Sequence, residues 1–250
     1  MRIRELKRTA RAYTMTPRKP NLFLVSGLYI LLGFLLMQLV TNLSALGQFQ
    51  HEIMTRSMAA MDSFVRAGGS LALEIPTINP TVFGLFFFIV PWIFLWVLDL
   101  GYLYYARGIV KGEEMGYRSL FEGFSYFAKA VLIRLLMAIT IFSGLFLFIL
   151  PGLWAVCAFS QANLLLLDNP DRGVFWCLRE SRRLMRGRKI QYLGLIISFF
   201  GWWFLTTLPF ISLAARMWYL PYLTFTQVGY YNGLTGQGPQ TSEWKRPGMF

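Results

Sequence analysis

Long apolar stretches are the feature that most restricts the fold of this chain. Several of them reach the ~20 residues that an α-helix needs to cross the hydrocarbon core of a bilayer. Of the 250 residues, 56% are hydrophobic and only 14% are charged, whereas a soluble domain carries about 25% charged residues. The sequence therefore predicts an all-α fold, a polytopic bundle of membrane-spanning helices.

Six stretches are predicted to span the membrane. They cover residues 21–40, 81–106, 130–150, 153–167, 191–208 and 211–231. Only Pro151 and Gly152 separate the third stretch from the fourth, and a turn near Pro209 separates the fifth from the sixth. Proline has no N–H to donate and suits such a reversal. The fourth stretch is short, and if it did not cross, every later segment would be inverted.

Basic residues set the predicted orientation. Of the 24 lysines and arginines, 21 fall before the first span, in residues 107–134, in residues 168–190 or after the last span. Because such residues gather on cytoplasmic loops, both termini are predicted to lie in the cytoplasm. The net charge of +12 then faces anionic lipid, and nucleic acid is not an expected partner.

The predicted organisation has three parts. They are a cytoplasmic basic amphipathic segment at 1–20, a six-helix transmembrane domain at 21–232 and a cytoplasmic tail at 233–250. Within the domain, we expect an external loop at 41–80 and cytoplasmic segments at 107–129 and 168–190. The longest loop is thus expected outside the cell and the basic segments inside it.

Three basic segments, 2–13, 117–131 and 173–186, place apolar residues at helical spacing. We expect each to be an amphipathic helix at the cytoplasmic surface of the membrane. The basic face of the third consists of Arg179, Arg182, Arg183 and Arg186. These guanidinium groups could meet lipid headgroups or a protein partner, or the helices could simply pack beneath the bundle, and both interpretations stay open.

Residues 113–118 read EEMGYR and match the EExxxR signature of intramembrane metalloproteases. Such an enzyme needs histidines in other spans to hold its metal, and the single histidine of the chain, His51, lies in the external loop. Glu113 and Glu114 are instead expected in the first turn of the 117–131 helix, where acids complement the helix dipole. The sequence does not support a protease.

Other enzyme classes find no support either. The chain has no GxxxxGK[ST] phosphate loop, no CxxC pair and no histidine available as a base for an intramembrane serine. The two cysteines, Cys157 and Cys177, are expected to be unpaired. We therefore expect a non-enzymatic protein with no catalytic residues and no cofactor.

One weak candidate for a metal site is present in the predicted external loop. It consists of His51, Met54, Met58 and Met61, which share one face of a helix. Imidazole and thioether groups suit Cu(I). Methionine stripes more often serve packing, so an amphipathic helix on the outer leaflet is the preferred interpretation, and no metal is expected.

Asp99 is the most costly residue in the predicted membrane. It lies ~12 Å inside the cytoplasmic boundary, at 1.5 Å per helical residue, and a charge there costs several kcal/mol unless it is paired or wetted. Arg134 and Arg216 are its candidate partners, and Gln161 and Asn163 add polar surface. These residues indicate either a polar cavity that binds a substrate headgroup or a proton, or a structural ion pair.

Short motifs occur in an ordered series along most of the chain. The last of them, within 197–234, are Ser198, Phe199, Gly201 and Trp202, then Pro221 with Tyr222, then Tyr230 with Tyr231. Earlier ones are RELKRTAR at 4–11, LFEGF at 120–124, LPGLWAV at 150–156, DNP at 168–170 and ESRRLMRGRK at 180–189. The series resembles a bacterial integral-membrane family catalogued as domain of unknown function 975, although Phe200 and Tyr230 replace its usual isoleucine and phenylalanine. The resemblance implies a helical protein of the bacterial cytoplasmic membrane and no particular activity.

Three hypotheses about function follow from these features. The first is a membrane protein that binds or translocates amphipathic molecules, such as lipids or hydrophobic peptides, because polar residues and broad aromatic surfaces coincide at membrane depth. The second is an accessory or scaffold subunit that holds a partner through its basic cytoplasmic helices. The third, immunity-type protection against membrane-active peptides, has no specific residues behind it.

Overall fold

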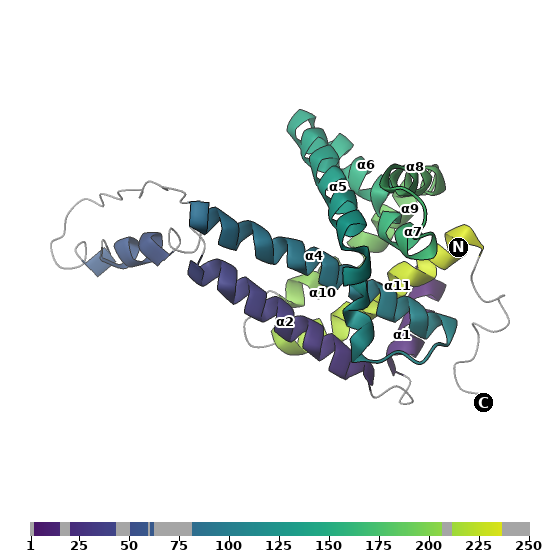
Figure 1. Ribbon diagram of the computed structural model, residues 1–250, viewed down its shortest axis with the longest axis horizontal. Helices are drawn as coiled ribbons and strands as arrows, with labels where there is room; N and C mark the ends of the chain where they lie inside the picture. Colours follow the sequence, from purple (N-terminus) through teal and green to yellow (C-terminus); the bar gives the residue numbers. More distant parts are fainter. Residues whose placement is uncertain are drawn as a thin grey trace. The chain divides into compact units, whose positions relative to one another are not determined.

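The computed structural model describes residues 3–15, 21–43, 51–59, 61–62, 82–206 and 212–236. All regular structure in these ranges is helical, as the sequence predicts (Figure 1). The α-helices are α1 Ile3–Met15, α2 Asn21–Leu43, α4 Val82–Lys111, α5 Phe127–Leu147, α6 Ile149–Phe159, α7 Ala162–Asp168, α8 Val174–Leu184, α9 Lys189–Ile197, α10 Phe200–Leu205 and α11 Ser212–Thr235. Two short 3₁₀ helices, η1 Tyr117–Leu120 and η2 Glu122–Tyr126, precede α5.

The chain divides into two compact units. One comprises Met1–Ile30 with Trp96–Phe250, and the other comprises Leu31–Leu95. The smaller unit contains helical residues 51–59, which belong to the predicted external loop. The larger unit contains helices α5 to α11 and the residues considered below as a site.

Four helical stretches in the described ranges are long and apolar enough to cross a membrane. They are Leu22–Val40, Ile89–Lys111, Tyr117–Leu147 and Ile149–Asp168. They correspond to the first four predicted spans. The fourth, which was predicted to be short, is long enough because its helical stretch starts at Ile149 and not at residue 153. The fifth predicted span is divided between α9 and α10, and the sixth, α11, is less apolar. The predicted turn near Pro209 lies outside the described residues.

Helices α5 and α6 form a hairpin whose turn differs from the prediction. The reversal occurs at Phe148, which is extended with φ −164° and ψ 153°, and not at Pro151 and Gly152. Both of these residues lie within the first turn of α6, where the N–H that proline lacks would have no helical acceptor. Gly144 and Gly152 bring the two backbones together, since a Cβ on Gly144 would lie 2.9 Å from the Gly152 Cα.

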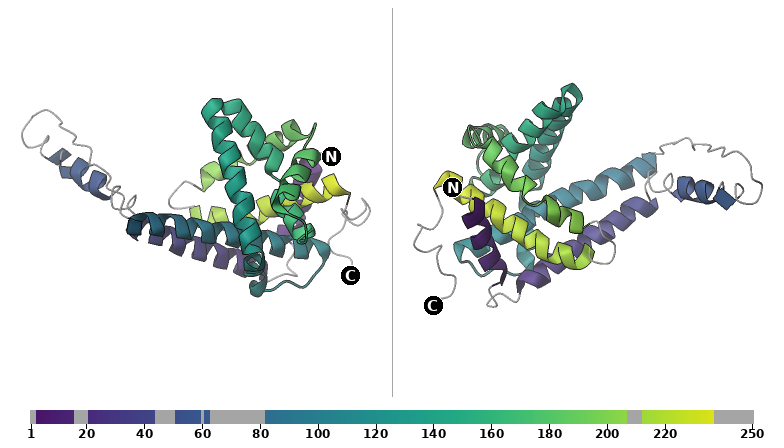
Figure 2. Two further views of the ribbon diagram at one scale, coloured as in Figure 1. Left: turned by 45° about the horizontal axis from the view of Figure 1, so that its top comes forward. Right: turned by 180° about the vertical axis from the view of Figure 1, so that it is seen from behind.

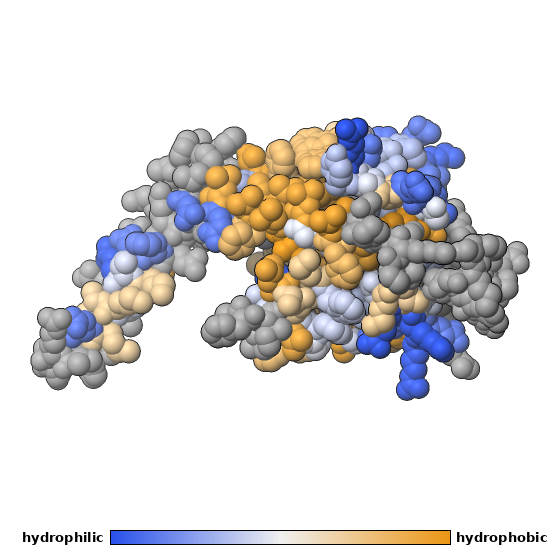
Figure 3. Space-filling model, turned by 90° about the horizontal axis from the view of Figure 1, so that it is seen from below, coloured by the Kyte–Doolittle hydropathy of each residue, from blue (hydrophilic) through white to orange (hydrophobic). Residues whose placement is uncertain are grey.

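The end of this hairpin exposes apolar side chains. Phe146 is 96% exposed and Leu150 is 77% exposed, and the residues between them are exposed as well. Figures 1 and 2 show α5 and α6 side by side up to their common end, and Figure 3 shows broad areas of hydrophobic residues on the surface that it draws. A soluble protein rarely leaves such apolar patches uncovered, so the exposed end of the hairpin is suited to contact with acyl chains.

The segment before α5 corrects another prediction. Residues 117–131 do not form one amphipathic helix, because η1 and η2 occupy 117–126 and α5 begins at Phe127. Glu113 and Glu114 are exposed in the turn that follows α4 and do not belong to the first turn of η1. The chain leaves α4 at Gly112, whose φ of +86° favours glycine. It then folds back against α4.

Helix α1 uses its apolar face for packing within the protein. Leu6 and Ala10 are buried, and Tyr13 stacks on Phe225 of α11 with ring centroids 5.8 Å apart. The arginines on the opposite face, including Arg8, are exposed. Of the two interpretations left open by the sequence, the structure therefore favours packing against the bundle for this helix.

Candidate binding cavity

The Asp99 carboxylate forms an ion pair with Arg134, which is one of its two predicted partners. Asp99 comes from the middle of α4 and Arg134 from the second turn of α5, so two helices supply the pair. Asn163 of α7 joins it. With its amide oxygen turned toward Arg134, that oxygen accepts hydrogen bonds from Nε at 3.1 Å and from Nη2 at 3.0 Å.

This ion pair lies in the wall of a cavity of about 450 Å³. Polar and aromatic groups from α4, α9 and α11, and from the α6–α7 and α9–α10 junctions, complete the lining. They include Tyr102, Ser160, Tyr192, Phe199, Tyr219, Thr224 and Gln227. Leucines such as Leu103 and Leu223 supply apolar surface between them. A volume of this size falls within the range of about 300–1,000 Å³ that is usual for small-molecule sites.

A break between α9 and α10 borders the cavity. The α-helix stops at Ile197 and resumes at Phe200, and Phe199 and Phe200 both line the cavity. Non-helical backbone at membrane depth is tolerated where it lines a cavity or is buried in protein. The position of the break beside the cavity therefore explains how a non-helical backbone is tolerated within the fifth predicted span.

Helix α1 contacts this break through Lys7. The Lys7 ammonium donates a hydrogen bond to the Ser198 carbonyl oxygen at 3.0 Å and lies 4.3 Å from the centroid of the Phe199 ring. Burial lowers the pKa of the Lys7 side chain. The end of α9 leaves the Ser198 carbonyl oxygen without a donor from the helix, and Lys7 of the amino-terminal segment supplies one.

Two predicted site residues do not belong to the cavity lining. Gln161 is 1% exposed at the junction of α6 and α7; its Nε2 donates to Ser160 Oγ at 2.9 Å, and its Oε1 has no hydrogen-bond partner among the described residues. Arg216 is exposed on α11 and does not contribute to the wall. Their predicted depth in the membrane suggested that these residues lie near Asp99. The rotation of their helices directs the two side chains elsewhere.

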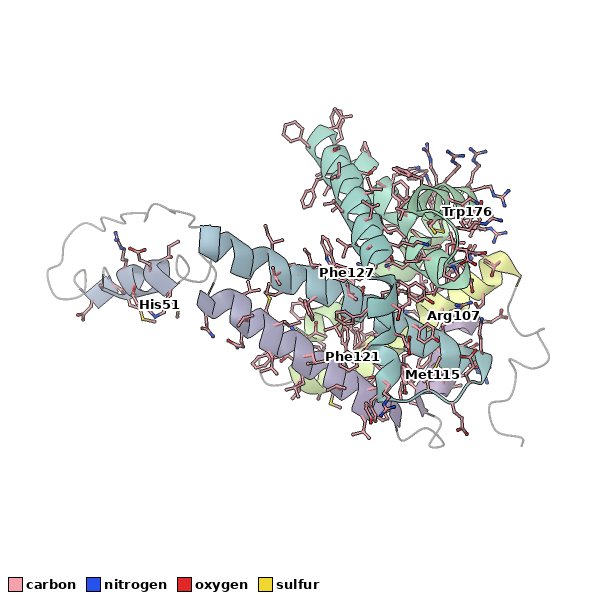
Figure 4. All side chains as sticks on the ribbon, viewed as in Figure 1. His51, Arg107, Met115, Phe121, Phe127 and Trp176 are labelled. Carbon is pink, nitrogen blue, oxygen red and sulfur yellow. The ribbon has the colours of Figure 1, made fainter. Side chains whose placement is uncertain are left out.

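A buried cluster of polar side chains was missed by the sequence analysis. Arg107, near the end of α4, forms an ion pair with Asp168 at the end of α7, and the Tyr231 hydroxyl of α11 donates to the same carboxylate. Arg107 is 9% exposed and also donates to the Leu167 carbonyl oxygen at 2.9 Å (it is labelled in Figure 4). We call Arg107, Asp168 and Tyr231 the clasp, because they tie together the carboxyl-terminal ends of three helices.

The basic face of α8 points away from the protein. Arg179, Arg182 and Arg183 of α8, and Arg186 in the turn that follows it, are all exposed. The opposite face is fixed at the α6–α7 junction by Ser181, whose hydroxyl donates to the Ala158 carbonyl at 2.8 Å and accepts from the Gln161 backbone N–H at 3.2 Å. The helix is therefore amphipathic as predicted, with its apolar side against the bundle and its arginines available to an outside surface.

The topology can be tested with single cysteines at exposed positions of the two predicted sides. We expect a membrane-impermeant maleimide to label Met58→Cys on intact cells and Arg186→Cys only after the cells are opened. The native Cys157 and Cys177 are 2% and 0% exposed, and burial raises the pKa of the Cys177 thiol, so neither should react. Labelling of Arg186→Cys on intact cells would reverse the predicted orientation.

The weak candidate for a metal site lies in the smaller unit. His51, Met54, Met58 and Met61 are all exposed (His51 is labelled in Figure 4). Within the same short helix, Thr55 donates to the His51 carbonyl and Arg56 pairs with Glu52. No group of histidine, cysteine or acidic residues in the described ranges could hold a metal ion. The weak candidate consists mainly of methionines, which are outside these residue types, and it stays a hypothesis.

Residues 144–238 match the family model described as Protein of unknown function (DUF975). The match confirms the family resemblance over the part of the chain that contains α6 to α11, including Asn163, Asp168 and Tyr231. The earlier motifs at 4–11 and 120–124 lie outside it. No curated protein matched the chain, and no solved structure did. The description of the family names no activity.

Proposed function

We propose that this chain, whose residues 144–238 place it with a family of unknown function, is a non-enzymatic integral protein of the bacterial cytoplasmic membrane. Its function is to bind or translocate amphipathic molecules, either lipids or hydrophobic peptides. The ligand occupies the cavity beside Asp99 and Arg134. The single observation that carries this proposal is a cavity of about 450 Å³ that combines this ion pair with aromatic walls.

The make-up of the cavity favours ligand binding over a purely structural ion pair. A structural pair is expected to be enclosed by protein, whereas the Asp99 side chain remains 42% exposed and the Arg134 side chain 27% exposed. Amide and hydroxyl groups line the same space. Few polar groups set among apolar walls are the usual composition of a small-molecule site, and they suit a molecule with a polar head and an apolar body.

Six spans with both termini in the cytoplasm remain our proposed topology. The clasp supports it, because the carboxyl-terminal ends of α4, α7 and α11 meet there. These helices end the second, fourth and sixth proposed spans, which must all finish on the same side. Lys129 at the start of α5 donates to the Pro170 carbonyl, and Tyr230 donates to the Arg188 carbonyl at 3.3 Å. The third and fifth proposed spans therefore begin at that same level.

A tryptophan that fills the cavity tests the proposed function. We expect the purified wild-type chain to carry bound phospholipid or peptide in native mass spectrometry. Leu223→Trp should lose it, because Leu223 lines the cavity and the indole would occupy part of its volume. Leu213→Trp is the matched control: it places the same side chain on α11 at a position that is 62% exposed. Equal binding by both variants, or no bound amphiphile on the wild type, would contradict the proposal.

The scaffold hypothesis also has one specific observation in its favour. Ser181 fixes α8, three arginines of which are exposed together with Arg186 just beyond its end. A fixed basic surface suits an acidic partner or anionic lipid headgroups. Reversing Arg179, Arg182, Arg183 and Arg186 to glutamate should release a partner in a pull-down from membranes. Under the scaffold reading the cavity variant Leu223→Trp would leave that partner bound.

A further inference from the structure

We propose that the cavity takes the headgroup of a zwitterionic phospholipid, with the ammonium group at Asp99 and the phosphate at Arg134. This inference rests on the proposed function and names the chemical class of the amphiphile. It goes beyond the general polarity of the site because it follows from the signs and the accessibility of two particular side chains.

The cavity has no net charge. Asp99 and Arg134 are the charged residues among the described residues that line it, and they carry opposite signs. The other polar lining groups are neutral amides and hydroxyls, such as Asn163, Gln227 and Thr224. A headgroup with one net charge would leave an unbalanced charge at membrane depth, which is costly. A headgroup with one charge of each sign keeps the site neutral.

Each member of the ion pair keeps capacity for a ligand. A carboxylate can accept about four hydrogen bonds and a guanidinium can donate five. Asn163 accepts two of the donors of Arg134 on one side, which fixes the guanidinium plane. Both side chains line the cavity and are partly exposed, so part of this capacity is accessible to a ligand. Phosphate is a preferred partner of a guanidinium held in this way.

The dimensions favour a headgroup with its acyl chains outside. The volume of about 450 Å³ is small beside a whole phospholipid. Leucine and methionine side chains, including Leu103 and Met137, line the remainder. Leu145 lies on the same face of α5 as Arg134 and Met137 and is 44% exposed. The acyl chains can therefore continue along this face of α5 as they leave the cavity.

A competition among three lipids tests the headgroup assignment. The full-length protein in mild detergent is mixed with equal amounts of phosphatidylethanolamine, phosphatidylglycerol and diacylglycerol that share the same chains, and adducts are counted by native mass spectrometry. We expect phosphatidylethanolamine to bind about tenfold more tightly than either of the other lipids, which corresponds to about 1.4 kcal/mol of binding free energy. This comparison uses the wild type and does not depend on the folding of any variant.

Single neutral substitutions should change the preference in opposite directions. Asp99→Asn leaves a net positive cavity and should shift the preference to phosphatidylglycerol. Arg134→Gln leaves a net negative cavity and should favour a cationic dialkyl ammonium amphiphile over both phospholipids. Arg118→Gln, an exposed arginine outside the cavity lining, is the control and should keep the preference of the wild type.

The outcomes separate this inference from the proposed function. If the three lipids bind equally and Leu223→Trp removes all of them, the cavity is a site but headgroup charge is not recognised, and the inference is wrong. If a hydrophobic peptide with blocked ends binds in the cavity and phosphatidylethanolamine does not, the ligand is not a phospholipid. If no amphiphile binds the wild type, the proposed function itself fails.

Discussion

Replacing Asp168 by leucine is expected to destabilise the protein by about 3–5 kcal/mol, the usual cost of removing one partner of a buried ion pair. Arg107 would remain 9% exposed with no carboxylate beside it, and the Tyr231 hydroxyl would lose its acceptor. Because the clasp joins α4, α7 and α11, the loss should affect the whole larger unit. Thermal unfolding in detergent, followed by fluorescence-detected size exclusion, measures it.

Three further variants identify the cause. Asp171→Asn changes an exposed acid three residues away and should have little effect. Tyr231→Phe removes one hydrogen bond to a charged group and should cost about 1.5–3 kcal/mol. Arg107→Met combined with Asp168→Leu removes both charges and should recover most of the stability. If Asp168→Leu unfolds no more easily than Asp171→Asn, the clasp contributes nothing.

The second large effect is expected from Gly101→Val. Gly101 of α4 faces the segment that folds back after it, and a Cβ on Gly101 would overlap the Leu120 carbonyl oxygen. Gly123 faces α4 in return, and a Cβ there would overlap the Val97 carbonyl oxygen. The obstructing atoms belong to the backbone and cannot rotate away, so the crossing must open. We expect a loss of at least about 1–3 kcal/mol, typical of overpacking, and little folded protein.

A matched glycine on a neighbouring helix serves as the control for this substitution. A Cβ on Gly27 of α2 would lie 3.8 Å from the Met217 Cε, an ordinary contact. Gly27→Ala should be neutral or stabilising, since alanine is favoured over glycine in a helix by about 1 kcal/mol. The yield of monomer on size exclusion and the midpoint of thermal unfolding compare the variants. Equal midpoints for Gly101→Val and Gly27→Ala would show that the close crossing is not required.

The Asp99–Arg134 and Arg107–Asp168 ion pairs differ in how far the sequence could reveal them. Asp99 stood out because a charge in an apolar stretch demands a partner, and Arg134 was one of two candidates. Arg107 and Asp168 lie at the ends of two predicted spans, where charges are common and need no explanation. Opposite charges at the same predicted depth, one of them in the DNP motif, were the signal that could have suggested the pair.

Residues 117–131 show a second limit of sequence patterns. Their aromatic and leucine residues recur every three or four positions, and that spacing is compatible with both α and 3₁₀ helices. The glycines at 101 and 123 decide between them, because they allow the segment to pack backbone against backbone on α4. A pattern along one segment contains no information about the surface against which it packs.

The sequence by itself predicted that the chain is helical, that it has six apolar spans, of which four are confirmed as long apolar helices, and that Asp99 needs a partner. These properties depend on local composition, because hydrocarbon thickness and backbone hydrogen bonding act on each stretch separately. The tertiary structure alone decided which side chains meet: the clasp, the support of the Ser198 break by Lys7, and the exclusion of Gln161 and Arg216 from the cavity. Those outcomes depend on the rotation and crossing of helices, which are set by contacts between residues distant in the sequence.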